Sequence, residues 1–309
     1  MIRLGLCCLF RDQPIRFRRT TAAALLKWPP KRRGEILSSI ARDNAQALMQ
    51  ALMYCAHQGI GCFRVNSQIL PLTTHPKAGY VVEDLPASGE LTALFKACGS
   101  FARKHHLRLS FHPDQFVLLN SPRLEVVRSS VRELEYQARL AEWIGADVIN
   151  IHGGGGYGDK KSALNRLRKN LDLLSPQVRK RLTLENDDRV YTLSDLLPVC
   201  REESIPLVYD LHHHRCLPDG RSVEKATQLA LTTWNREPLF HLSSPLAGWR
   251  GGNPRPHHDF IDPADFPKEW KTLDVTIEVE AKAKEVAVLR LLRDMKIRPW
   301  KTHLAAVKD

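Results

Sequence analysis

The chain contains 309 residues, of which 43% are hydrophobic and 26% are charged. This balance is typical of a soluble globular protein and argues against a disordered or fibrous chain. No apolar run approaches the ~20 residues that a bilayer-spanning helix requires. The apolar start of the chain lacks the longer core and the cleavage site of a signal peptide. We therefore expect a cytoplasmic protein without membrane association or an obligate protein partner.

Eight β-type segments follow one another along the chain, and segments of helical periodicity separate them. The strands are predicted at 2–9, 62–67, 107–112, 147–153, 182–187, 206–212, 239–244 and 275–281. The helices are predicted at 35–58, 89–106, 123–144, 162–174, 192–203, 222–236 and 282–295. This eightfold alternation predicts a single (β/α)8 TIM barrel, so we assign residues 1–309 to one domain.

Three long connections, at 10–33, 68–86 and 245–272, each follow a predicted strand. In barrels of this kind, the loops after the strands build the active site. Residues 11–33 carry eight Arg or Lys against one Asp, within a chain of net charge +12. This segment is either a solvated basic loop or a loop that binds nucleic-acid phosphates. Trp28 either stacks on a base or packs under the loop.

Cysteine usage agrees with a reducing compartment. The cysteines are odd in number and none forms a CxxC pair: Cys7, Cys8, Cys55, Cys62, Cys98, Cys200 and Cys216. Several stand in apolar stretches, so we interpret them as small core residues with free thiols.

Most of the predicted strands end in histidine or a carboxylate. His112, His152 and Glu185 end three successive strands, whose ends lie ~5 Å apart in a barrel. They can converge on one ion, which Glu185 bridges to a second. Further candidate ligands follow at the other strand ends and in the long loops: Asp210, His213, His241, His257 or His258, Glu280 and His75. About nine nitrogen and oxygen ligands imply two or three divalent ions, zinc or manganese in preference to copper or iron–sulfur.

Alternation along the last strand predicts that Thr276, Glu278 and Glu280 face the barrel interior. Glu280, nearest the strand end, is the candidate ligand. The deeper Glu278 is expected to pair with Lys282 or with an arginine.

A glycine run, Gly153–Gly156, follows the fourth strand without the spacing of a Walker loop. Either these glycines let the backbone approach a ligand, so that Lys160 or Lys161 reaches a phosphate, or they form a flexible turn. A cluster of metals suits hydrolysis of a phosphodiester, because one ion makes hydroxide and another stabilises the leaving oxygen. Together with the basic surface, the cluster predicts a metal-dependent endonuclease.

Six motifs carry a resemblance that covers residue 1 to about 296. They are HPDQF (112–116), NIHGGGGYGDK (150–160), LENDD (184–188), YDLHHH (209–214), HDFID (258–262) and EAKAKE (280–285). In combination they resemble the ultraviolet-damage endonuclease family, whose barrels are similar to those of apurinic-site endonucleases. The resemblance implies incision of damaged double-stranded DNA immediately 5′ to a pyrimidine dimer or photoproduct, which leaves a 3′-hydroxyl.

The resemblance also implies a manganese-preferring three-metal site and a role for each matched residue. The matched ligands are His112, His152, Glu185, Asp210, His213, His241, His257 and Glu280. His75 matches a further site histidine, and Lys160 matches a lysine near the scissile phosphate, so we expect both to act in catalysis with Glu185. Gln115 and Phe116 match a Gln–Tyr pair that probes the duplex opposite the extruded dinucleotide. We expect Arg16, Arg18 and Arg19 to bind DNA phosphates.

Three departures from the family pattern bear on this expectation. Leu239 stands where the family tends to carry a lysine, two residues before His241, which concerns the third metal. Leu6 and Phe10 replace an aromatic and an amide near the end of the first strand, which concerns damage specificity. Phe116 has no tyrosine hydroxyl.

Two other enzyme classes and one non-catalytic class remain as alternatives. A sugar isomerase or epimerase barrel also uses Glu, Asp and His at strand ends, but usually without a basic first loop. The others are an apurinic-site endonuclease and a DNA-binding relative that has lost catalysis. Nicking of supercoiled plasmid with manganese separates the nucleases from the rest.

Overall fold

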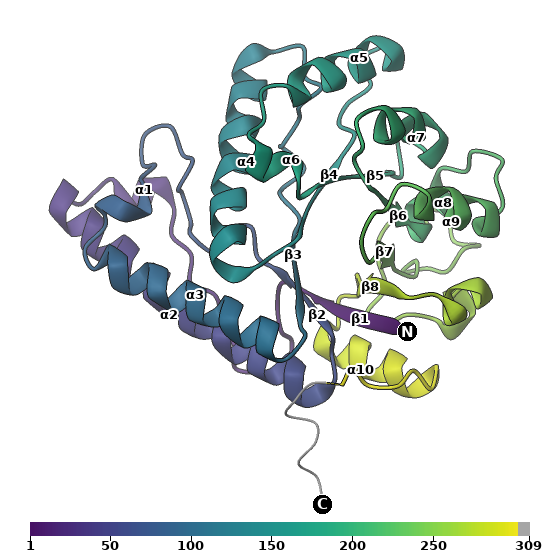
Figure 1. Ribbon diagram of the computed structural model, residues 1–309, viewed down its shortest axis with the longest axis horizontal. Helices are drawn as coiled ribbons and strands as arrows, with labels where there is room; N and C mark the ends of the chain where they lie inside the picture. Colours follow the sequence, from purple (N-terminus) through teal and green to yellow (C-terminus); the bar gives the residue numbers. More distant parts are fainter. Residues whose placement is uncertain (302–309) are drawn as a thin grey trace, which may run out of the picture.

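Eight parallel strands close into one barrel, in the order in which they occur in the chain. The computed structural model describes residues 1–301, and Figure 1 shows the ring of strands surrounded by helices. The strands are β1 Ile2–Cys7, β2 Cys62–Val65, β3 Arg108–Phe111, β4 Val148–His152, β5 Leu182–Glu185, β6 Leu207–Asp210, β7 Leu239–Leu242 and β8 Val275–Val279. The predicted (β/α)8 barrel is confirmed. The assignment of residues 1–309 to one domain includes residues 302–309, which lie outside the described residues.

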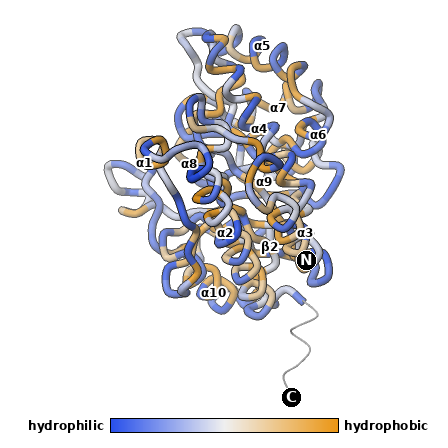
Figure 2. Tube along the Cα trace, turned by 90° about the vertical axis from the view of Figure 1, so that its left-hand side faces the viewer, coloured by the Kyte–Doolittle hydropathy of each residue, from blue (hydrophilic) through white to orange (hydrophobic). Residues whose placement is uncertain are grey.

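The helices lie outside the ring of strands, with α2 and α3 side by side (Figure 1). They are α1 Ala22–Leu25, α2 Pro30–Gln58, α3 Ser88–Lys104, α4 Leu124–Ile144, α5 Lys160–Leu171, α6 Pro176–Arg179, α7 Leu193–Glu202, α8 Leu211–Cys216, α9 Val223–Leu231 and α10 Glu285–Asp294, with short 3-10 turns η1 Val82–Asp84, η2 Pro263–Asp265 and η3 Lys268–Thr272. Hydrophilic and hydrophobic residues alternate along them, as α5 shows in Figure 2. None of the described helices is long and apolar enough to cross a membrane.

Element boundaries differ from the prediction at the start of one helix and at the ends of most strands. The longest helix, α2, begins at Pro30 and not at residue 35, because proline is well tolerated in the first turn of a helix. Most strands end two residues earlier than predicted. After β1, for example, Cys8 adopts a φ of 64° and leaves the strand direction. The final residues of the predicted strands therefore belong to the turns of the barrel mouth.

The apolar core has two separate parts. The larger part fills the space between the strands and the helices, with Trp270, Tyr209 and Phe240 among its fully buried side chains. The smaller part consists of Val148, Val208 and Leu239. Leu239 shares its strand face with His241, two residues on, so this small cluster lies inside the barrel. The barrel interior is thus apolar in the layer of these three residues and polar closer to the mouth, where His152, Asp210 and His241 follow on the same strands.

The end of the described chain covers the opposite face of the barrel. The guanidinium of Arg3 lies 3.7 Å from the centroid of the Trp300 ring. The Trp300 indole N–H donates to the carbonyl oxygen of His106 at 2.9 Å, and its backbone N–H donates to that of Gly59 at 2.8 Å. These contacts attach the segment after α10 to the start of β1 and to the end of α2.

Candidate metal centre

Glu185 occupies the middle of a cluster of histidines and carboxylates at the C-terminal ends of the strands. Its Oε2 lies 2.9 Å from Nε2 of His112 and 4.0 Å from Nε2 of His152. Its Oε1 lies 3.1 Å from Nδ1 of His241 and 3.3 Å from Nδ1 of His213. The side chain is only 1% exposed. One buried carboxylate therefore joins ligand candidates that come from four other elements.

Asp210 and His213 form a second part of the cluster, where β6 runs directly into α8. Asp210 caps the helix, because its Oδ1 accepts the backbone N–H of His213 at 2.7 Å. Asn186 holds this junction: its side chain exchanges hydrogen bonds of 2.8 and 3.0 Å with the Asp210 backbone, and its carbonyl oxygen lies 2.9 Å from Nδ1 of His213. The turn after β6 therefore fixes both candidate ligands beside Glu185.

Glu280 and His241 form the third part, against the buried guanidinium of Arg64. Oε1 of Glu280 lies 2.6 Å from Nη2 of Arg64 and 3.5 Å from Nδ1 of His241. Its Oε2 lies 3.7 Å from Nδ1 of His257, which the β7–β8 loop contributes. Nε of Arg64 also lies 3.1 Å from Oε2 of Glu278, one layer deeper. Of the two partners predicted for Glu278, Lys282 or an arginine, the structure shows an arginine.

The donor set fits divalent cations. Three groups have ligand atoms that all lie within 4.8 Å of one another: His112–His152–Glu185, His112–His241–Glu280 and Glu185–Asp210–His213. Seven of the eight predicted ligands belong to these groups, and His257 lies beside them. Within the described part of the chain, Oδ2 of Asp210 and Nδ1 of His152 are buried without a hydrogen-bond partner. Buried polar atoms normally have hydrogen-bond partners. Unpartnered carboxylate oxygens and imidazole nitrogens of this kind fit a metal ion with nitrogen and oxygen ligands.

The protonation states of the cluster also suit a cation. Burial by itself opposes ionisation of Glu185, but the histidines around it, His241 first, hold its pKa well below the ordinary value. Burial would lower the pKa of His213, yet the charges of Asp210 and Glu185 raise it well above the ordinary value. The Glu185 carboxylate is therefore ionised at neutral pH. A divalent ion would displace protons from such histidines as it bound.

A layer of polar side chains beneath the cluster was not predicted as part of the site. Asn150 donates to Oε2 of Glu185, and Thr183 donates to Oδ1 of Asn150 at 2.8 Å. Ser110 donates to Oε1 of Glu278. Each of these residues precedes a candidate ligand by two positions, on the same strand face. The pattern polar–x–ligand, repeated on several strands, is the sequence signal that would have found them.

His75 and Lys160 lie apart from the three ligand groups. Nδ1 of His75 accepts the backbone N–H groups of Lys77 and Ala78 at 3.1 Å, so this ring nitrogen stabilises its own loop. Nζ of Lys160, in the first turn of α5, donates to Oδ2 of Asp195 at 3.0 Å. Both side chains thus have partners outside the cluster, and their catalytic roles stay predictions.

The two residues expected to probe DNA lie on the loop after β3. Gln115 and Phe116 are both exposed, and Phe116 is 73% exposed, whereas the next residue, Val117, is buried. The alternative that Phe116 is a core residue under this loop is therefore wrong. The ring is available for contact with a partner.

The three arginines of the basic loop differ in their availability. Arg16 turns back onto its own loop and donates to the carbonyl oxygens of Gln13 and Ile15, at 2.5 and 3.1 Å. Arg18 forms an ion pair with Asp43 on α2. Arg19 is exposed and has no ion pair among the described residues. Two of the cations expected to contact phosphates therefore hold the loop in place. Phosphate binding by the three arginines stays a prediction, and Arg19 has the fewest competing contacts among the described residues.

The glycine run after β4 packs against the protein itself. A Cβ at Gly153 would lie 2.8 Å from the Tyr191 ring, and one at Gly154 would overlap Oδ1 of Asn120. Asn120 and Tyr191 both donate to the carbonyl oxygen of Gly155, at 2.7 and 3.0 Å. Neighbouring side chains thus occupy the space that these glycines leave and anchor the loop. Whether the loop also approaches a ligand, so that Lys160 or Lys161 reaches a phosphate, stays a prediction.

The residues that depart from the family pattern on the first and seventh strands are all buried. Leu239 packs with Val148 and Val208 inside the barrel and offers no ligand atom. Leu6 is fully buried. Phe10 stacks on Phe63 with ring centroids 6.0 Å apart. Each of these departures is thus absorbed by apolar packing.

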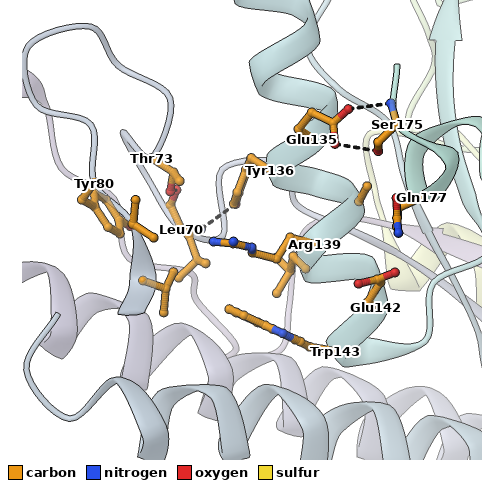
Figure 3. Close-up of a pocket in the computed structure, with 14 residues that line it drawn as sticks. Leu70, Thr73, Tyr80, Glu135, Tyr136, Arg139, Glu142, Trp143, Ser175 and Gln177 are labelled. Carbon is orange, nitrogen blue, oxygen red and sulfur yellow. Dashed lines mark hydrogen bonds between the residues drawn. The ribbon is translucent and has the colours of Figure 1, made fainter. Parts of the chain in front are cut away.

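A separate cavity of about 370 Å³ lies outside the barrel, between α4 and the loop after β2 (Figure 3). Some of its polar groups pair with one another: Glu135 accepts hydrogen bonds from Ser175, and Tyr136 accepts the backbone N–H of Leu70. None of the candidate ligands lines it. This cavity is therefore separate from the candidate metal centre at the barrel mouth.

Fold and site together define a TIM-barrel enzyme with a histidine–carboxylate centre at its C-terminal face. The family model described as UV-endonuclease UvdE matches residues 2–305. The UV DNA damage endonuclease of Bacillus velezensis is 36% identical over 304 residues, which cover 93% of this chain and 91% of that protein. The crystal structure of SacUVDE superposes with a TM-score of 0.85 at 29% identity, over 96% of this chain and 99% of that one. The chain belongs to the UV-endonuclease UvdE family.

Family membership makes this protein a DNA endonuclease of the class that acts on ultraviolet damage, and it decides against the sugar isomerase. Endonuclease IV from Thermus thermophilus superposes with a TM-score of 0.56 at 16% identity, over 95% of this chain and 97% of that one. A likeness of that degree shows a shared fold alone. It gives the apurinic-site alternative no separate support.

Proposed function

We propose that this protein nicks the damaged strand of double-stranded DNA immediately 5′ to ultraviolet photoproducts, pyrimidine dimers among them, by metal-dependent hydrolysis. The observation that carries the proposal is the position of Glu185, which lies within 4.0 Å of four histidines and belongs to two of the three ligand groups. A carboxylate in that position can bridge two ions. Neighbouring ions of this kind are the arrangement used for in-line displacement at phosphorus.

Eight residues would hold two or three divalent ions, with manganese favoured and zinc possible: His112, His152, Glu185, Asp210, His213, His241, His257 and Glu280. When bound, such ions supply hydroxide at neutral pH and neutralise charge on the leaving oxygen, which becomes the 3′-hydroxyl. The ligand group His112–His241–Glu280 receives no ligand atom from position 239, because Leu239 is apolar and buried. We therefore propose that its ion is the most weakly held of the three.

The chain's own groups position the substrate. Gln115 and Phe116 probe the duplex from the loop after β3. His75 keeps only Nε2 for substrate or solvent, since Nδ1 accepts two backbone N–H groups. Lys160 must exchange its ion pair with Asp195 for a phosphate oxygen, which an exposed pair allows at little cost.

The decisive experiment compares Glu185→Gln with the wild-type protein on ultraviolet-irradiated and unirradiated supercoiled plasmid, across manganese, zinc and magnesium. Wild type should nick irradiated plasmid only, and EDTA should abolish nicking. Glu185→Gln should lower the rate by several orders of magnitude, because the bridging charge is lost. Glu125→Gln, an exposed carboxylate at the start of α4, is the matched control and should behave as wild type.

An oligonucleotide with one defined dimer, labelled at the 5′ end, then locates the cut. Incision directly 5′ to the dimer with a 3′-hydroxyl is expected. Full activity of Glu185→Gln, or equal nicking of irradiated and unirradiated plasmid, would overturn the proposal. Cleavage at an apurinic site in preference to a dimer would favour the apurinic-site alternative. Tight binding without nicking in any metal would indicate a relative that has lost catalysis.

A further inference from the structure

A cavity of about 370 Å³ opens beside the metal centre, between the end of β1 and the turn from β8 to α10. Glu280 and His257 form the wall that it shares with the centre, and Cys7 lies next to the wall under Arg64. Lys282 and Lys284 line the other side. The cavity is therefore a recess at the barrel mouth, with candidate metal ligands on one side and two ammonium groups on the other.

The turn after β8 holds both lysines on the cavity side. Ala281, Ala283 and Glu285 are buried, at 0–2% exposure, whereas Lys282 is exposed and Lys284 is half-buried. Every second residue of the turn thus packs into the protein, and the intervening two line the recess. The position of the lysines follows from this packing and does not depend on a flexible surface loop.

Glu285 also joins this turn to the basic loop. Its carboxylate accepts the backbone N–H groups of Arg11, Asp12 and Gln13, at 2.7, 2.7 and 3.1 Å. A buried carboxylate with three donors is a firm anchor. The recess and the start of the basic loop are therefore parts of one rigid surface.

The backbone of Lys284 is strained. Its φ of 53° and ψ of −125° lie in a region that side chains with a Cβ rarely adopt. Cys8, on the facing wall, has a φ of 64°. Strained residues of this kind concentrate at ligand-binding sites, where the surrounding structure enforces them. Glycine would fit position 284 without strain, so this substitution can remove the lysine side chain without disturbing the backbone.

The two ammonium groups are available to an anion. Among the described residues, neither Lys282 nor Lys284 forms an ion pair with a carboxylate. The carboxylates nearest the recess are already occupied, since Arg64 contacts both Glu278 and Glu280. Lysine cannot ligate a cation, because its protonated amine has no acceptor. The ligand that fits is therefore an anion next to the metal centre.

We propose that this recess is a phosphate subsite, in which Lys282 and Lys284 bind a backbone phosphate of the DNA next to the one at the metal centre. The proposal rests on the proposed function for the identity of the polyanion. It adds a contact that fixes the register of the strand: with one phosphate held in the recess, its neighbour along the strand is placed at the metal centre. Lysine is suited to such a contact as a point charge.

The test measures binding of a fluorescent duplex by anisotropy over a series of KCl concentrations, without divalent ions. Lys282→Gln and Lys284→Gln should each lower the magnitude of the salt slope by about 1, and the double variant by about 2. Lys284→Arg should keep the slope. Lys96→Gln, an exposed lysine on α3, is the matched control and should leave the slope unchanged.

Lys284→Gly separates a ligand role from a structural one. Glycine relieves the strained backbone, so the melting temperature should rise while the salt slope falls by about 1. Manganese affinity of every variant should equal that of wild type, which shows that Glu280 and its neighbours are undisturbed. Replacing single phosphates of the duplex by neutral methylphosphonates should reveal one position at which Lys284→Gln has no further effect. That position should adjoin the scissile phosphate.

An unchanged salt slope in the double variant overturns the subsite, as does weaker binding without a change of slope. A methylphosphonate position remote from the cut overturns the proposed register. The proposed function fails differently, by absence of nicking of irradiated plasmid in wild type. Because the slope is measured on binding alone, it reports on the recess whether or not the protein nicks.

Discussion

Phe116→Ala should separate recognition of damage from folding. The ring is 73% exposed in the free protein, so its removal exposes almost no additional apolar surface. Surface substitutions of this kind usually change the free energy of unfolding by no more than about 0.5 kcal/mol. The melting temperature of Phe116→Ala should therefore equal that of wild type.

The effect on binding should be much larger than the effect on stability. If the ring fills the gap that an extruded nucleotide leaves, stacking contributes ~1–3 kcal/mol per base. That range corresponds to a loss of lesion affinity of about 5- to 150-fold. Extrusion from a duplex costs a few kcal/mol, and a flexible single strand has no stack to hold open. Activity on a damaged single strand should therefore fall much less.

The assay uses one dimer-containing oligonucleotide, either single-stranded or annealed, with binding measured by anisotropy and incision by gel. Phe116→Tyr should keep both activities because the stacking face remains. Val117→Ala is the control for structural damage: Val117 is buried, and loss of its two methyl groups should cost about 1.5 kcal/mol of stability. A fall in the melting temperature of Phe116→Ala, or an equal loss on duplex and single strand, would refute the reasoning.

Two further predictions concern the first loop and the far face of the barrel. Replacing Arg16, Arg18 and Arg19 together by alanine should weaken binding to damaged and undamaged duplex alike. It should lower the magnitude of the salt slope by no more than about 3. Because Arg16 and Arg18 already have partners within the protein, Arg19→Ala alone should account for most of the change in slope. Equal slopes in wild type and the triple variant would show that the loop does not touch DNA. Trp300→Ala should lower stability by roughly 2 kcal/mol, since it removes a cation–π contact with Arg3 and an indole hydrogen bond. Thermal melting checks this, and nicking at room temperature should be unchanged; loss of nicking at an unaltered melting temperature would contradict a purely structural role.

The sequence by itself determined the architecture and the candidate ligands that the barrel brings together. Strand alternation has a period of two and helix periodicity a period near 3.6, so both are visible without any tertiary contact. Residues such as His112, His152 and Glu185 stand where β-type runs stop, and parallel strands in a barrel all end on one face. Convergence of the ligands therefore follows from topology. It required no knowledge of distances.

Only the tertiary structure decided which side chains have partners. Arg64 pairs with Glu278 and Glu280 from a strand more than 200 residues away, and no local pattern encodes such a pairing. The same holds for Arg18, whose charge is taken up by Asp43, and for the glycines after β4, whose space is filled by Asn120 and Tyr191. Exposure is equally non-local.

Phe116 and Phe10 show the point most simply. Both are phenylalanines in loops after strands, yet one is exposed and the other stacks on Phe63 in the core. A residue's type sets what it gains by burial. Whether it is buried depends on which distant segments the closed barrel brings against it, and that is fixed only when all eight strands have paired.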